Sequence, residues 1–168
     1  LDTYFERSVG NNLEKLQNFT KYVPRQNLSR FLAKYEIFKQ VLNVQVSIVE
    51  CGVYQGGGLM TFAKLSAIFE PVNYQIKIIG FDTFEGFTDL SPEDQSGSSV
   101  HAVTGGLFLD AGIYEDMQEC IELYDSNRFI GHIPKVFLVK GDIKETVPKY
   151  IEDHPSTVVS LLYLDVDV

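Results

Sequence analysis

The sequence has few basic residues and no long apolar run. Its 14 Lys and Arg residues stand against 23 Asp and Glu residues, which gives a net charge of −9, and the basic residues do not cluster. A nucleic-acid backbone or an anionic membrane surface would repel such a chain, so both classes of partner are disfavoured. None of its apolar runs approaches the roughly 18 residues that span a bilayer.

Cysteine is also scarce, since Cys51 and Cys120 are the two cysteines of the sequence. The first residues mix polar and apolar side chains and lack the pattern of a secretory signal. We therefore expect a soluble, cytoplasmic protein in which both thiols are reduced.

The length of 168 residues corresponds to one domain, and a chain of this size buries enough surface to fold without disulfides or metals. The chain begins at a leucine and ends just after a strand-like run, at 158–164. Such a strand normally leads into a loop and a helix. We therefore expect a fragment of a longer protein, with an exposed sheet edge.

The spacing of apolar residues differs between the first part of the chain and the rest. Apolar residues recur every three or four positions across 13–42, which predicts helices interrupted at Pro24, the second starting near Asn27. Four short apolar runs then predict buried strands at 46–51, 76–81, 136–140 and 158–164. Helical spacing returns between them, at 59–69, 114–128 and 144–153. This alternation predicts an α/β fold with a mostly parallel sheet and helices on both faces.

The segment 83–112 is rich in Gly, Ser, Thr and Asp. A loop of that length inside a compact domain is typical of a lid or a binding loop.

A carboxylate stands at the end of each predicted strand: Glu50, Asp82, Asp142 and Asp165. In a parallel sheet the carboxyl ends of all strands lie on one edge, and ligands bind there where the strand order reverses. The sequence therefore predicts a ligand site at this edge.

Glycines follow the first strand, at 52 and 56–58, and they allow a tight turn and a close approach of ligand to backbone. The dinucleotide fingerprint G-x-G-x-x-G is absent, because Tyr54 occupies the place of its second glycine, and no Lys-Ser/Thr pair follows as in a P-loop. Asp82 ends the next strand, where a carboxylate accepts the hydroxyls of a ribose. The combination indicates a nucleoside cofactor without a diphosphate, which S-adenosylmethionine fits. A plain helix cap and a turn-forming aspartate are the structural alternatives.

Asp165 and Asp167 are two positions apart in an extended segment, so both side chains face the same way. Paired carboxylates suit Mg²⁺, which lowers the pKa of a bound hydroxyl so that a neighbouring carboxylate removes its proton. A solvated strand end is the alternative.

The chain resembles the macrocin O-methyltransferase family in three stretches: VECGVYQGG at 49–57, GFDTFEGF at 80–87 and LDVDV at 164–168. These are metal-dependent enzymes that use S-adenosylmethionine to methylate sugar hydroxyls. The resemblance implies a Rossmann-like class I methyltransferase fold, with 46–168 as a partial cofactor domain whose C-terminal strands are missing. It also implies that the helical segment 1–45 serves lid and dimer contacts in a homodimer.

The resemblance also implies roles for individual residues. Glu50 and Gly52 would lie near the methionine moiety, Asp82 would bind the ribose, and Asp142 and Ile143 would lie beside the adenine. Asp165 would be a metal ligand, and Asp167 would be the general base and a second ligand. The implied cofactor contacts are completed by Tyr54, Gly56, Gly57 and Thr83.

Two other hypotheses remain open at this point. One is a different nucleotide-sugar-modifying transferase on the same layout. The other is a non-catalytic or truncated module that binds cofactor or dimerises, since the Asp-Asp pair that completes the family's metal site would follow on a further strand.

Overall fold

The computed structural model describes residues 2–44, 46–86 and 112–166. Asp167 and most of the predicted lid lie outside the described residues. The elements are, in chain order, α1 (Asp2–Arg7), α2 (Asn12–Gln17), a 3₁₀ turn η1 (Phe19–Lys21), α3 (Arg25–Val41), β1 (Ser47–Cys51), α4 (Gly57–Phe69), β2 (Ile78–Asp82), α6 (Ile113–Ser126), β3 (Val136–Lys140), α7 (Ile143–Asp153) and β4 (Val159–Leu164).

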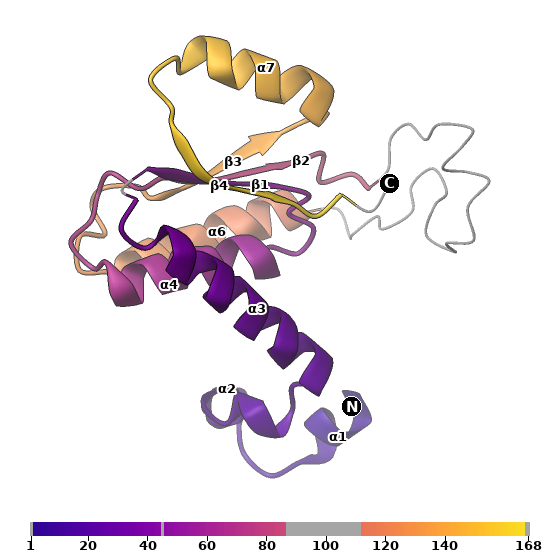
Figure 1. Ribbon diagram of the computed structural model, residues 1–168. Coiled ribbons are helices and arrows are strands. Elements are labelled where there is room, and N and C mark those ends of the chain that lie inside the picture. Colours follow the sequence, from indigo (N-terminus) through magenta and orange to yellow (C-terminus); the bar gives the residue numbers. More distant parts are fainter. Residues whose placement is uncertain (1, 45, 87–111, 167–168) are drawn as a thin grey trace.

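The four strands form one parallel sheet in the order β3-β2-β1-β4. Helices α3, α4 and α6 lie on one face of this sheet and α7 lies on the other (Figure 1). The predicted α/β class, the parallel strands and the helices on both faces are confirmed. The second helix starts at Arg25 rather than near Asn27, because Pro24, fixed at φ −58°, already takes the N-cap position.

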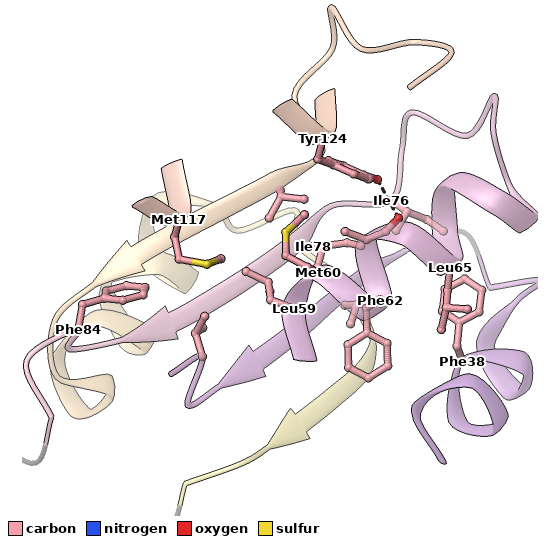
Figure 2. Close-up of a cluster of buried hydrophobic side chains, with 14 residues drawn as sticks. Phe38, Leu59, Met60, Phe62, Leu65, Ile76, Ile78, Phe84, Met117 and Tyr124 are labelled. Atoms are coloured by element: carbon pink, nitrogen blue, oxygen red, sulfur yellow. Dashed lines mark hydrogen bonds between the residues drawn. The ribbon is translucent and has the colours of Figure 1, made fainter. Parts of the chain in front are cut away.

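Alternation along the strands divides the core between the two faces of the sheet. Ile48 and Ile78 join the larger cluster, to which α3, α4 and α6 contribute Phe38, Phe62 and Met117 (Figure 2). The intervening residues form a smaller cluster under α7, made of Val49, Cys51, Ile79 and Phe81. Strand β1 is buried along its whole length, since it has a neighbour on each side.

Strand β4 forms one edge of the sheet, where Leu162 and Leu164 are exposed. Both cysteines are free thiols, as the sequence predicted. Within the described ranges, no helix combines the length and the apolar character needed to span a membrane.

A buried hydrogen bond ties α6 to α4. The hydroxyl of Tyr124 donates to the carbonyl of Ala63 over 2.7 Å, inside the larger core cluster (Figure 2). Tyr124→Phe should lower the free energy of unfolding by about 1 kcal/mol, the net value of such a bond. Urea denaturation measures this change. Tyr74→Phe, at an exposed tyrosine, should change nothing, and equal stability of both variants would contradict the assigned bond.

Candidate functional site

The carboxyl ends of all four strands are joined by backbone hydrogen bonds. The amide of Gly52 donates to Phe81, that of Asp165 donates to Cys51, and that of Gly141 donates to Asp82, each over 2.9 Å. Strands β2 and β3 extend from one side of β1, and β4 lies on the other side. The order therefore reverses between β1 and β4, which is where open α/β sheets bind ligands.

Glu50 lies inside this switch point. Its side chain extends from β1 beneath the first turn of α4, and the residue is 1% exposed. A Cβ added at Gly58 would overlap its Oε1, so only glycine fits above it. Within the described part of the chain, its Oε2 atom is buried without a hydrogen-bond partner. A buried carboxylate with an unused acceptor is costly unless a donor or cation binds it, so this oxygen is a candidate contact for a ligand.

Burial raises the pKa of Glu50 from its ordinary 4.5 to about 8, and Lys34 opposes the shift. Between these two pKa values the folded chain binds more protons than the unfolded chain does. The free energy of unfolding should therefore fall as the pH rises from 4.5 to about 8, by on the order of a few kcal/mol.

Glu50→Gln should remove most of this fall, because glutamine does not ionise. Urea denaturation at about pH 5 and about pH 8 measures it. Glu36→Gln, at an exposed glutamate on α3, should keep the wild-type pH dependence. The same pH dependence in wild type and Glu50→Gln would contradict the assignment.

The loop between β1 and α4 has an unusual backbone. Gly52 and Gly56 have φ of +88° and +80°, and Tyr54, a residue with a Cβ, has φ of 52°. A Cβ at Gly52 would overlap the carbonyl oxygen of Asp165, so the loop lies directly against the end of β4. Positive φ at a bulky residue costs about 1–3 kcal/mol and is held only where the surroundings impose it.

Asp82 imposes this conformation from the end of β2. Its Oδ2 accepts from the amides of Val53 and Tyr54 over 2.7 and 2.9 Å, and its Oδ1 accepts from the amide of Phe84 over 2.7 Å. The carboxylate thus fixes the glycine loop over the sheet edge. These three bonds leave it with one of about four acceptor positions.

The first turn of α4 offers backbone donors at the same edge. Gly56 is its N-cap, and no side chain caps the turn. An added Cβ at Gly57 would meet no described residue within 4 Å, so the described part of the chain leaves this backbone open to a ligand. Gly56 packs against Met117 of α6, which fixes the turn from behind.

The other predicted cofactor residues have clear local contacts. Thr83 donates from its hydroxyl to the carbonyl of Gly86 over 2.8 Å. Asp142 follows β3 and caps α7 by accepting from the amide of Lys144 over 2.8 Å. Ile143 is partly buried against the smaller core cluster. The structure brings Glu50 and Asp165 to the ends of β1 and β4, at the switch point, while these three residues lie along the β2 and β3 ends.

Of the two predicted metal ligands, the structure describes Asp165, because Asp167 lies outside the described residues. Among the described residues, Asp165 pairs with the Lys34 ammonium, which lies 3.9 Å from its Oδ2. Across the described ranges, no three His, Cys, Asp or Glu side chains group in a way that could hold a metal. The described donors therefore do not by themselves form a divalent-cation site.

Sequence reasoning missed Lys34 and Tyr163. Lys34 lies on α3, one turn before the buried Phe38 and next to the partly buried Tyr35, both of which belong to the larger core cluster. A charged residue within an apolar stripe is the signal that could have identified it, because a buried lysine needs a partner.

No protein-family model and no curated protein matches the sequence. Solved structures do match. A crystal structure of CalS11, a calicheamicin methyltransferase, superposes with a TM-score of 0.93 at 33% identity, covering 99% of this chain and 65% of CalS11. The chain has the fold of this methyltransferase. An apo structure of CalS11, described as a TDP-rhamnose 3′-O-methyltransferase of calicheamicin biosynthesis, matches at TM-score 0.80 and 29% identity, over 99% of this chain and 63% of that one.

The O-methyltransferase NovP matches at a TM-score of 0.58 and 17% identity, over 83% of this chain and 54% of NovP, which shows a shared fold alone. The chain therefore spans less than two thirds of the length of each of these enzymes. The resemblance to the macrocin O-methyltransferase family stays a prediction.

Proposed function

We propose that the chain is the cofactor-binding part of an S-adenosylmethionine-dependent O-methyltransferase that acts on a hydroxyl of a sugar or glycosylated metabolite. One observation carries the proposal. Glu50 is buried at the β1–β4 switch point, and its Oε2 has no hydrogen-bond partner among the described residues. The similarity to CalS11, a TDP-rhamnose 3′-O-methyltransferase, supports a sugar as the acceptor class.

The described residues fit the proposed cofactor. S-adenosylmethionine carries an ammonium and a sulfonium, and the unused oxygen of Glu50 is an acceptor for a cationic group. Gly57 and the uncapped first turn of α4 offer backbone N–H groups to its carboxylate. When bound, the cofactor would supply the methyl group that the acceptor hydroxyl takes up.

The remaining residues of the site have proposed roles. Asp82 would position the loop of Gly52, Tyr54 and Gly56 and would give its last acceptor position to the ribose. Thr83, whose hydroxyl donates to the carbonyl of Gly86, would contact the cofactor next to Asp82. Asp142 and Ile143, at the β3 end, would lie beside the adenine.

Asp167 is proposed as the base that removes the proton from the acceptor hydroxyl. Asp165 and Asp167 are also proposed as ligands of a divalent cation such as Mg²⁺, as the sequence predicted. Because the described donors do not complete such a site, no catalytic step is assigned to the metal.

Transfer of a labelled methyl group tests the function. The chain, and a version extended past Val168, would be incubated with methyl-labelled S-adenosylmethionine, Mg²⁺ and TDP-rhamnose. Label in the sugar nucleotide supports the proposal. Binding of a nucleotide in preference to S-adenosylmethionine, with no transfer by either version, would favour a different transferase.

A homodimer formed through segment 1–45 is proposed as well. Several apolar side chains of α2 and α3 are exposed there, among them Leu13, Leu16, Phe31 and Leu32. Exposed apolar patches of this kind mark interaction surfaces. Light scattering at several concentrations tests the dimer, and a monomer at all of them would contradict it.

A further inference from the structure

Helix α3 places a lysine inside the site. Lys34 is 8% exposed, and its Nζ donates to the hydroxyl of Tyr163 over 3.2 Å. The same Nζ lies 4.4 Å from the centroid of the Tyr163 ring and 3.9 Å from Oδ2 of Asp165. Its ammonium is therefore fixed at the carboxyl end of β4 by three contacts of different kinds.

Glu50 lies near the stem of the same lysine. The position that a Cβ would take at Gly58 overlaps Oε1 of Glu50 and is 3.0 Å from Cε of Lys34. The lysine stem and the Glu50 carboxylate are therefore neighbours beneath the first turn of α4. The side chain of Lys34 therefore passes Glu50 of β1 and ends beside Asp165, the residue after β4.

The burial of Lys34 has a cost, because a buried lysine loses much of the water around its ammonium. A leucine or methionine would fill the same space without that cost. Two carboxylates close together repel each other, and a nearby cation offsets that repulsion. A cationic ligand would favour the ionised form of Glu50, and Glu50, Asp165 and Lys34 together would then carry a net negative charge that suits such a ligand.

We propose that Lys34 is a positioning residue of the cofactor site. Resting on the function proposed above, this inference makes α3 part of that site. The ammonium holds Glu50 and Asp165 in fixed places across the β1–β4 crevice, so that Oε2 of Glu50 faces the cationic group of S-adenosylmethionine. Lys34 itself acts through Glu50 and does not touch the reacting atoms.

Affinity for S-adenosylmethionine, measured by calorimetry, tests this role. Lys34→Met keeps the apolar stem and removes the charge, and it should weaken binding by about tenfold or more, as expected for a charge-assisted contact. Lys34→Arg should keep most of the affinity. Lys39→Met, on the same helix at an exposed lysine, should bind as wild type does.

A double-mutant cycle separates positioning from mere packing. If Lys34 acts through Glu50, Lys34→Met should cost less than about threefold in affinity when Glu50→Gln is already present. If Lys34 had a purely structural role, Lys34→Met would weaken binding by the same factor in the wild-type chain and in Glu50→Gln. Circular dichroism and thermal unfolding of each variant establish that it is folded. If Lys34→Met does not fold, Tyr163→Phe, which removes the acceptor hydroxyl alone, should weaken binding severalfold.

The outcomes discriminate between the two proposals. Equal affinity of wild type and Lys34→Met, or equal loss in both backgrounds, overturns the role of Lys34 and leaves the proposed function intact. Failure of the folded wild-type chain to bind S-adenosylmethionine overturns the proposed function, and the role of Lys34 with it. A loss in Lys34→Met that arginine restores and Glu50→Gln suppresses supports both.

Discussion

Gly52→Ala is expected to destabilise the chain by about 3 kcal/mol or more and to abolish binding of S-adenosylmethionine. Two costs add up. The residue has φ of +88°, which an alanine adopts only under strain. The new Cβ would also overlap the carbonyl oxygen of Asp165 and lie 2.8 Å from its carbon, both of which are backbone atoms that cannot turn away.

Gly57→Ala is the matched control for stability. Its Cβ would meet nothing within 4 Å, and alanine favours the helix that begins there. Urea denaturation should therefore show unchanged or slightly raised stability for Gly57→Ala beside a large loss for Gly52→Ala. Similar stability of the two variants would show that the loop does not lie against β4 as described.

Asp82→Ala is expected to have the second large effect. The substitution leaves the amides of Val53, Tyr54 and Phe84 without their acceptor, and each bond to a charged group contributes about 1.5–3 kcal/mol. Water would replace part of the lost hydrogen-bond energy, because the site is partly open to solvent. We expect a loss of about 3 kcal/mol in the free energy of unfolding and loss of measurable cofactor affinity.

Asp142→Ala gives the comparison for Asp82. Its carboxylate also follows a strand, but among the described residues it accepts from one amide, that of Lys144. The substitution should cost about 1 kcal/mol, as the loss of a helix cap does. Denaturation of both variants measures the difference. If Asp82→Ala cost no more than Asp142→Ala, the glycine loop would not depend on Asp82 for its conformation.

Much of the fold was predictable because local patterns dictate it. Strand β1 was placed within one residue and β3 at its observed bounds, since short β-branched runs closed by glycine allow few alternatives. The start of α3 was misplaced by two residues. Alternation of strands and helices also predicted that the carboxylates would meet at one edge, and Glu50, Asp82 and Asp165 do lie at that edge.

The partners of these carboxylates were not predictable. Asp82 was singled out for a ribose, yet two of its donors are the amides of Val53 and Tyr54, which are 29 and 28 residues away in sequence. Lys34 meets Tyr163 across 129 residues. Such contacts depend on the strand order and on how α3 packs, and neither leaves a periodic signal in the sequence.

The central claim is that the β1–β4 crevice binds S-adenosylmethionine through Glu50. Calorimetric titration of S-adenosylmethionine into the wild-type chain and into Glu50→Gln, with Glu36→Gln as control, tests it most directly. We predict saturable binding by wild type and by Glu36→Gln, and binding about tenfold or more weaker by Glu50→Gln, because a neutral amide replaces the carboxylate that meets the cation. Equal affinity of all three folded chains, or no binding by any of them, would contradict the claim.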